Sequence, residues 1–343
     1  CSAIYGWPHA GIQVDCGSQE GGAVAAEAWA RLLHPQRGAP WGWPAAFILT
    51  HLHTDHYNGV LHASASATFP RLHSLREVFS AGMPQVPERT QFLHALFASA
   101  FRTLGSDTGH MEYDFLRAVV RLNGGRKVSY RRLFQGDQFA VGGAQFECIW
   151  PPRKVADPPF EALVKKALDS FREACEVDPV LRQIEERIDR DPFYTNLLAE
   201  NADTITFDES EFGPNRAPSI EVPREIPPAT KKANKSLTEI ANHLSLAFRA
   251  GSWLVMWGDV SQSRLPSAVE FLRSSRTHNF DCMVAPHHGT YWHDCLLQLR
   301  SENTLISHGP KLISKFRPEW KCISGSVDST YVGGDLDLCL GPW

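Results

Sequence analysis

The sequence predicts an α/β fold in which strands and helices alternate along the chain and pack in layers. Short apolar runs that end in a polar residue or a glycine recur throughout the 343 residues, and such runs are typical of buried strands. Between many of them, apolar residues recur at spacings of three and four, which is the pattern of an amphipathic helix. Because functional sites in layered α/β folds gather at strand ends, the residues that follow the apolar runs are the first candidates for chemistry.

The predicted elements can be placed in chain order. Five predicted strands end in a polar cluster, and these are residues 12–14, 47–50, 253–257, 282–286 and 304–307. Two further runs, 127–134 and 138–150, are predicted to form a strand pair. The predicted helices are residues 22–33, 88–104, 111–122, 160–176, 179–190 and 265–275.

Two long stretches interrupt this pattern and are predicted to be insertions into a single domain that spans residues 1–343. Residues 70–126 are predicted to be mainly helical, and residues 153–235 begin as charged helices and then become rich in proline. A loop as long as this second part is usually functional or disordered. We therefore expect residues 201–235 to form a lid or a flap that binds a partner, with a mobile excursion of no function as the alternative.

Composition excludes several classes of protein. The chain has 34 Lys and Arg against 38 Asp and Glu, a net charge of −4, so no global field attracts it to nucleic acid or anionic lipid. Its longest apolar runs last about five residues, against the roughly 20 that a membrane helix needs, so no membrane span is expected. Eight cysteines without a C-x-x-C pair are typical of a reduced enzyme, which favours the cytoplasm. Because the chain begins at Cys1 rather than with methionine, a targeting segment stays open.

The sharpest signal is a cluster of three of the 15 histidines, in the sequence His51-Leu52-His53-Thr54-Asp55-His56. Two histidines separated by one residue can converge on one metal ion, and the Asp-His pair that follows can turn toward a second ion. Imidazole and carboxylate groups suit Zn²⁺, Mn²⁺ or Fe ions. Since chance placement rarely gives this pattern, we expect a metal site here, with a surface cluster as the alternative.

This histidine motif after an apolar strand resembles the motif of the metallo-β-lactamase-fold hydrolases. Other stretches narrow the resemblance to the ComEC-type competence hydrolase domain and its free-standing relatives, and they follow in that family's order. These stretches are Phe134-Gln135-Gly136-Asp137 through Trp150-Pro151-Pro152, Asn242-His243-Leu244-Ser245-Leu246, Trp257-Gly258-Asp259, Ala285-Pro286-His287-His288-Gly289-Thr290 and Ile306-Ser307-His308-Gly309. The resemblance covers most of the chain outside the two insertions.

The resemblance implies a four-layer αββα sandwich with two divalent metal ions, Zn²⁺ favoured and Mn²⁺ as the alternative. It implies that His51 and His53 bind the first ion, that Asp55 and His56 bind the second, and that Asp259 bridges both. Asp15 would orient a ligand or a loop from behind the site. A hydroxide shared by two such ions attacks the substrate while one ion stabilises the developing negative charge, so no serine or cysteine nucleophile is needed.

Several site residues keep two interpretations. Either His287 or His288 should complete the set of ligands around the second ion. His287 is favoured, and His288 would then protonate the leaving group or contact the substrate. A third histidine for the first ion is not evident. His243 is the candidate because it lies on the matched strand, with a core or surface histidine as the alternative, and His110 is a poorer candidate. His308 is expected either to contact the substrate or to be an ordinary strand-end residue.

Three functions remain, in order of preference. The first is hydrolysis of a phosphodiester, in a nucleic acid or a nucleotide, by a metal-bound hydroxide, with Asp55, His288 and His308 as catalytic residues. Local basic runs could follow phosphates or could be solvated faces; they are Arg126, Lys127, Arg131 and Arg132, and Lys231, Lys232 and Lys235. The second is hydrolysis of a small molecule such as a lactone, thioester or β-lactam, which the net charge favours. The third is a binding module without catalysis, against which the complete set of ligands argues.

Overall fold

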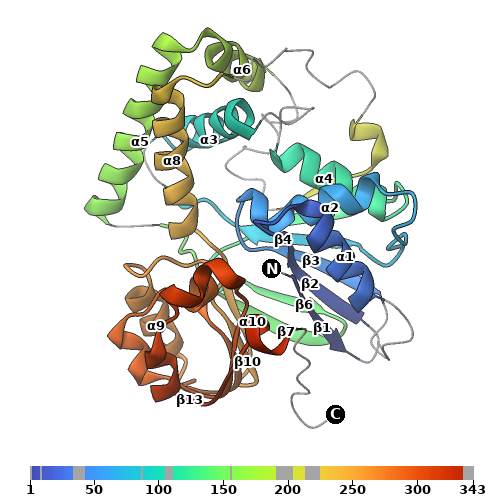
Figure 1. The fold of residues 1–343 in the computed structure, drawn as a ribbon, viewed down its shortest axis with the longest axis vertical. Helices are drawn as coiled ribbons and strands as arrows, with labels where there is room; N and C mark the ends of the chain where they lie inside the picture. The colour runs from blue at the N-terminus through green and yellow to red at the C-terminus, as the bar shows by residue number, and fades with distance from the viewer. Residues whose placement is uncertain are drawn as a thin grey trace.

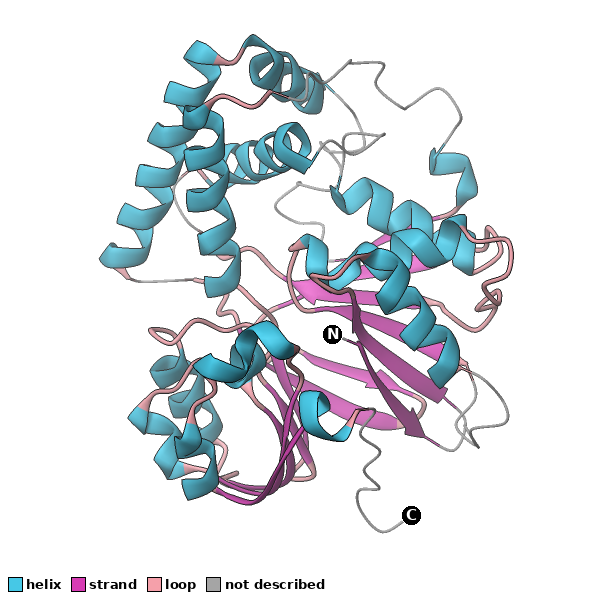
Figure 2. Ribbon diagram, in the orientation of Figure 1, coloured by secondary structure: helices cyan, strands magenta, loops and turns pink. Residues whose placement is uncertain are grey.

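Two mixed β-sheets face each other at the centre of the molecule, and helices cover their outer faces (Figures 1 and 2). The computed structural model describes residues 2–7, 10–33, 43–85, 88–104, 111–154, 157–190, 204–212 and 225–334. Within them the architecture is an α/β sandwich, which confirms the predicted fold class.

The first sheet has six strands in the order β1-β2-β3-β4-β5-β8. Their bounds are Ser2–Trp7 for β1, Ala10–Cys16 for β2, Pro44–Leu49 for β3, Glu77–Ala81 for β4, Val128–Leu133 for β5 and Thr204–Phe207 for β8. Strands β2 to β5 are parallel, whereas β1 and β8 pair antiparallel at the two edges. The carboxyl ends of the four parallel strands therefore meet at one edge of the sheet.

The second sheet has seven strands in the order β13-β12-β11-β10-β9-β7-β6. Their bounds are Gln138–Val141 for β6, Ala144–Trp150 for β7, Ala247–Ala250 for β9, Leu254–Met256 for β10, Asn279–Val284 for β11, Arg300–Ile306 for β12 and Ser324–Ser329 for β13. Strands β10 to β13 are parallel, and the remaining pairs are antiparallel. The four parallel strands again deliver their following turns to one edge.

Alternation along the strands divides the core between the layers. In β3, Ala46 and Ile48 belong to an apolar cluster that also contains Phe146 and Phe248 of the second sheet, so this cluster fills the space between the sheets. Phe47, the residue between them, belongs instead to the cluster formed with the helices. Successive side chains of a strand point to opposite faces, so one apolar run serves two layers.

Helices in two groups cover the first sheet. Helices α1 (Gly22–Leu32), α2 (Thr54–Ala65) and α4 (Met111–Leu122) lie on the sheet itself. Helices α3 (Arg89–Leu104), α5 (Pro158–Val177), α6 (Pro179–Arg190) and α8 (Pro228–His243) form a second group, at the upper left of Figure 1. In this helical group, α5 packs against α8, and α3 packs against α6 and α8.

The second sheet is covered by α9 (Leu265–Ser274), with a short helix α10 (Thr330–Gly333) after β13. Several 3₁₀ turns join the strands, and they are η2 (Glu209–Phe212), η3 (Pro286–Gly289), η4 (Asp294–Gln298), η5 (Pro310–Lys315) and η6 (Pro318–Cys322). Of the helices described, none has the length and the apolar run that crossing a membrane requires.

The predicted helices are confirmed as α1, α3, α4, α5, α6 and α9. The two stretches predicted as insertions, however, also contain strands and a helix that the sequence did not indicate. Residues 70–126 also hold strand β4, which pairs with β3 and β5 inside the first sheet. The proline-rich part of 153–235 holds strand β8 and the start of helix α8. Much of the predicted flap at 201–235, residues 201–203 and 213–224, lies outside the described residues.

Candidate metal centre

The candidate site lies where the turns after β3, β10, β11 and β12 meet at the edge of both sheets. Each turn follows a buried strand directly, so the rigid sheet positions the polar residue that comes next. The turns contribute a shared set of imidazoles and carboxylates, which are His51, His53, Asp55 and His56 after β3, Asp259 after β10, His287 and His288 after β11, and His308 after β12.

Unusual backbone angles direct these side chains into the site. Asp15, His287 and His288 have φ values of 46°, 46° and 59°, and Gly258 has a φ of 54°. Non-glycine residues rarely adopt this left-handed conformation, and it concentrates at functional sites. The backbone N–H of His287 donates to the carbonyl of Gly258 at 2.9 Å, so the turn that carries Asp259 and the turn that carries the histidine pair support each other.

One carboxylate oxygen, Oδ2 of Asp259, is surrounded by the Nε2 atoms of four histidines. The distances to it are 3.9 Å for His51, 3.6 Å for His56, 3.8 Å for His287 and 3.9 Å for His288. These separations exceed an ordinary hydrogen bond, whereas a cation between such atoms would contact several of them at once. Asp259 is only 6% exposed, so the group is shielded from bulk water.

Oxygen atoms behind the site fix the other ring nitrogen of two of these histidines directly. Nδ1 of His56 lies 2.7 Å from Oδ2 of Asp15, and Nδ1 of His288 lies 2.7 Å from the carbonyl oxygen of Ser307. A carboxylate and a carbonyl can only accept, so both Nδ1 atoms are donors. Nε2 is then the nitrogen of each ring directed toward Asp259.

The same tautomer follows for His287 by elimination. Nδ1 of His51 lies 3.1 Å from Thr50 Oγ1, which donates to Asp15 Oδ2 at 2.7 Å, and 3.4 Å from Ser245 Oγ. Thr290 Oγ1 donates to the carbonyl of His287 and therefore accepts from its Nδ1 at 2.7 Å. Ligating histidines in metal sites are oriented in this way, by an acceptor on the far ring nitrogen.

Burial and charge set the protonation of the cluster. Burial together with the nearby imidazoles holds the pKa of His51 well below its usual range, so this ring is neutral. Burial would also lower the pKa of His56, but the carboxylates of Asp15 and Asp259 outweigh it and raise that pKa to about 10. Conversely, burial would raise the pKa of Asp259, yet His56 and the neighbouring histidines hold it well below its usual value. Without a metal ion, the imidazolium of His56 therefore lies between the carboxylates of Asp15 and Asp259.

Two groups of side chains have ligand atoms close enough to one another to hold an ion. The first is His51, His56 and Asp259, and the second is Asp55, His56 and His288. The donor set fits a divalent ion such as Zn²⁺, because it combines imidazole nitrogen with carboxylate oxygen. Nε2 of His51 supports this fit, since it is buried and has no hydrogen-bond partner among the described residues.

No protein-family model and no curated protein matches this chain.

His53 lies beside this cluster but outside both groups. Its ring is 4.4 Å from that of His51, and its Nε2 donates to the carbonyl of Thr238 in α8 at 2.9 Å. Because Nε2 is a donor, Nδ1 is the nitrogen that could bind an ion. Among the described residues, the structure does not bring His53 into a group with the expected partners.

The assignment within the histidine pair differs from the one the sequence favoured. His287 was expected to be the ligand, but His288 is the residue whose Nε2 joins Asp55 and His56 in one group. The ring of His287 stacks on Tyr291 with centroids 3.9 Å apart. The geometry thus favours His288 as the ligand and leaves His287 beside it.

His243 does not reach the metal centre. It is the last residue of helix α8, not part of a strand, as the matched motif had suggested. Its Nδ1 faces Ser261 Oγ at 2.9 Å and accepts from Arg264 Nε at 3.4 Å. Burial and the adjacent guanidinium of Arg264 lower the pKa of His243, so this residue is a neutral, half-buried histidine. His110, the poorer candidate, lies outside the described residues.

A cavity of about 250 Å³ opens beside the second group. Asp55 and His288 line it together with His308 and Lys311, which places His308 where a substrate contact was expected. Burial lowers the pKa of His308, so its imidazole is neutral at pH 7. Gln19, also in the lining, donates to Asp55 Oδ2 at 3.2 Å.

Two residues at the site had been given no role from the sequence. Thr50 bridges Asp15 and His51 as described above, and its backbone N–H donates to Asp15 Oδ1 at 2.8 Å. Ser245 is fully buried, and its Oγ accepts from the backbone N–H of Asp259 at 2.8 Å. The position of Thr50 at the end of a strand directly before the first histidine was the available signal.

Proposed function

We propose that this protein is a metal-dependent hydrolase, that its α/β sandwich is the metallo-β-lactamase fold, and that its substrate is a phosphodiester. The observation that carries the proposal is the set of four histidines whose Nε2 atoms surround Asp259 Oδ2, three of which have their tautomers fixed from behind. A structural cluster has no need for four imidazoles with the same ring nitrogen directed at one carboxylate. The resemblance of the motifs to metallo-β-lactamase-fold hydrolases supports the same conclusion.

In this proposal, His51, His56 and Asp259 hold one ion. Asp55 and His288 hold a second ion together with His56, which belongs to both groups. Zn²⁺ is favoured by the imidazole ligands, with Mn²⁺ as the alternative. Divalent ions supply a lowered pKa for water and stabilisation of negative charge on oxygen. His287, which faces Asp259 from outside both groups, is placed to carry a proton to the leaving group.

A phosphodiester is favoured over a neutral substrate by a cation at the cavity and by further cations on helix α8. Lys311 lines the cavity beside Asp55 and His288. Helix α8, whose Thr238 carbonyl contacts His53, also carries exposed lysines at 231, 232 and 235. The other basic run does not form one phosphate-binding surface, because Arg132 is only 6% exposed and its neighbour Arg131 lies on the opposite face of β5.

The test uses the metal-loaded full chain and bis-p-nitrophenyl phosphate, together with short DNA and RNA. We expect close to two transition-metal ions per chain and hydrolysis that depends on Zn²⁺ or Mn²⁺. Asp55→Ala should lower the rate more than about a hundredfold, since even residues that only orient a ligand cost about 10- to 100-fold. Asp169→Ala, at an exposed site on α5, is the matched control and should leave the rate unchanged.

Two results would replace this proposal. Activity confined to lactones, thioesters or nitrocefin would reverse the order of the two hydrolase functions. A metal-free chain that turns over none of these substrates, but captures a partner through residues 201–235, would indicate the binding module. Full activity of a metal-free Asp55→Ala protein would exclude metal-dependent hydrolysis at this site.

A further inference from the structure

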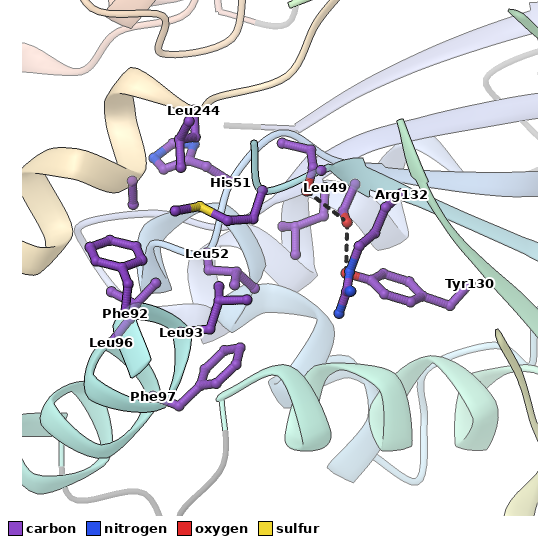
Figure 3. A pocket seen from close by; sticks show the side chains of 15 residues that line it. Leu49, His51, Leu52, Phe92, Leu93, Leu96, Phe97, Tyr130, Arg132 and Leu244 are labelled. Atoms are coloured by element: carbon purple, nitrogen blue, oxygen red, sulfur yellow. Dashed lines mark hydrogen bonds between the residues drawn. The ribbon is translucent and has the colours of Figure 1, made fainter. Parts of the chain in front are cut away.

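An apolar pocket lies next to the metal centre and has no part in the function proposed above. It is enclosed by the ends of β3, β4 and β5 and by helices α3 and α8 (Figure 3). Side chains from these elements give it an almost entirely apolar lining, including Leu52, Met83, Phe92, Leu93, Leu96 and Leu244. His51, a residue of the first metal group, also lines it. A ligand in this pocket would therefore lie beside the metal centre.

One charged side chain interrupts the apolar lining. Arg132 is only 6% exposed, and the centre of its guanidinium lies 5.8 Å from the ring centroid of Tyr130. Among the described residues, no carboxylate pairs with this guanidinium and no oxygen accepts a hydrogen bond from it. Figure 3 shows Arg132 and Tyr130 together on one side of the pocket, with the α3 side chains on the other.

The Arg132 side chain is largely withdrawn from water, and an anion in the pocket would give its guanidinium a partner. A guanidinium binds carboxylates and phosphates with two parallel hydrogen bonds. Ser80 Oγ and Tyr130 Oη, which lie 2.6 Å apart beside it, add polar groups at the same place. The polar end of the pocket thus has the chemistry of an anion site.

The remaining lining determines what accompanies the anion. The cavity of about 60 Å³ exceeds the roughly 10–15 Å³ that a single water molecule needs. Apart from His51, the polar side chains of the lining, Ser80, Tyr130 and Arg132, lie together at one end. Apolar cavities of this kind take up apolar groups rather than water. The occupant should therefore combine a short apolar group with one anionic terminus.

We propose that this pocket binds a short acyl or aromatic group that ends in an anion, with the anion paired to Arg132. In the enzyme, this group is the part of the substrate, or of the product, that lies beside the bond being hydrolysed. That last role rests on the proposed function, whereas the binding itself does not.

The experiment measures binding of hexanoate to the full chain without metal, by titration calorimetry. Hexan-1-ol, which lacks the charge, should bind about tenfold more weakly or worse, because a charged hydrogen bond is lost. Acetate, which lacks most of the chain, should bind about a hundredfold more weakly, because four methylene groups no longer leave water. Equal binding of hexanoate and hexan-1-ol to the unaltered protein would overturn the proposal without any variant.

A pair of adjacent arginines provides the matched variants. Arg132→Met should abolish the preference for hexanoate over hexan-1-ol, whereas Arg131→Met, one residue away on the other face of β5, should keep it. A preference that survives Arg132→Met in a folded protein would place the anion elsewhere and overturn the proposal. Should Arg132→Met not fold, Leu96→Trp, which fills the pocket from α3, should weaken hexanoate binding at least tenfold.

This result is separable from the outcome for hydrolysis. Selective hexanoate binding by a chain that hydrolyses nothing would retain the pocket and reject the proposed function. Hydrolysis of bis-p-nitrophenyl phosphate by a chain that does not bind hexanoate would retain the function and reject the pocket. When both hold, hexanoate should inhibit hydrolysis by the unaltered and the Arg131→Met proteins but not by Arg132→Met.

Discussion

Asp15 shows how a residue behind the candidate metal centre can determine the chemistry of the proposed ligands. Its carboxylate accepts from the backbone and side chain of Thr50 and from Nδ1 of His56. These contacts fix the tautomer of His56 and hold the hydroxyl of Thr50 beside Nδ1 of His51. One carboxylate therefore orients His56 directly and contacts His51 through Thr50.

Replacing this carboxylate by an amide should weaken metal binding. Asp15→Asn removes the charge opposite His56 Nδ1, and we expect the affinity for Zn²⁺ to fall about 10- to 100-fold, as for other residues that orient a ligand. The backbone should tolerate the change, because asparagine adopts the left-handed conformation of residue 15 readily. Competition with a chromophoric chelator measures the affinity.

The control for this variant is Asp169→Asn, at an exposed position on α5, which should bind Zn²⁺ as the unaltered protein does. Equal affinities for the Asp15→Asn and Asp169→Asn proteins would contradict the role given to Asp15.

The sequence could predict most residues of the site but not their division of labour. Histidines at 51 and 56 stand in one motif, so their convergence is visible without a structure. The choice between His287 and His288 depends on two successive left-handed residues, which no spacing rule reveals. His243 looked suitable only because its neighbours matched a strand motif, whereas the structure ends a helix there and satisfies its ring with Ser261 and Arg264.

At the scale of elements, the turn after β10 depends on a glycine. Gly258 has a φ of 54°, and a Cβ at this position would lie 2.7 Å from both the carbonyl oxygen of Leu246 and Oγ of Ser245. Gly258→Ala should lower the free energy of unfolding by at least about 1–2 kcal/mol, from backbone strain alone. It should also weaken Zn²⁺ binding, since Ser245 Oγ supports the N–H of Asp259. Denaturant titration and the chelator competition measure the two effects.

Gly309→Ala is the matched control for this turn. No heavy atom lies within 4 Å of a Cβ at Gly309, and its φ of −96° is accessible to alanine. Its stability and affinity should stay close to those of the unaltered protein. If Gly258→Ala behaved in the same way, the turn would not depend on glycine.

A buried ion pair joins helices of the helical group, and it is the basis of a second prediction at the scale of elements. Arg102 of α3 donates from Nε to Asp178 Oδ2 at 2.8 Å, both side chains are at most 3% exposed, and Thr230 of α8 donates to the same oxygen. Asp178→Asn removes one buried negative charge beside the guanidinium and should cost about 3–5 kcal/mol, measured by denaturant titration. Glu88→Gln breaks an exposed pair with Arg172 and should cost less than about 1 kcal/mol. Similar losses in both variants would show that burial of the pair is unimportant.

The elements that the sequence failed to predict share a physical reason, which is that their own residues show only a weak local pattern. Strand β4 is five residues long, and its place between β3 and β5 can be seen only once those strands have paired. Helix α2 contains the metal motif and a glycine, so its apolar stripe is weak, and its packing through Tyr57, Val60 and Ala63 compensates. Helix α8 follows a proline-rich stretch that concealed its spacing of buried residues.

Over the whole molecule, helix α8 connects the helical group to the metal centre. Its Thr238 carbonyl accepts from His53, and the chain that leaves it passes through Ser245 to Leu246, whose N–H donates to the carbonyl of Thr50 at 2.7 Å. The same helix closes the apolar pocket beside His51. A change in the helical group would thus reach both the proposed metal ligands and the pocket next to them.

Metal binding by the whole protein should be linked to pH through His56. Without metal, the pKa of His56 is raised from 6.5 to about 10, so the ring is protonated at neutral pH, and a metal ion must displace that proton. This protonated ring stabilises the metal-free fold fully below pH 6.5, and the contribution is lost as the pH rises through about 10. We therefore expect about one proton released per chain on Zn²⁺ binding at pH 7.5, from calorimetry in two buffers of different ionisation enthalpy. The gain in Tm on adding Zn²⁺ should grow from pH 6.5 to pH 9.

The control for this linkage is His243→Gln, outside the cluster, which should leave the proton release and the pH dependence of Tm unchanged. A gain in Tm that is independent of pH, without proton release, would remove His56 from the proposed metal ligands.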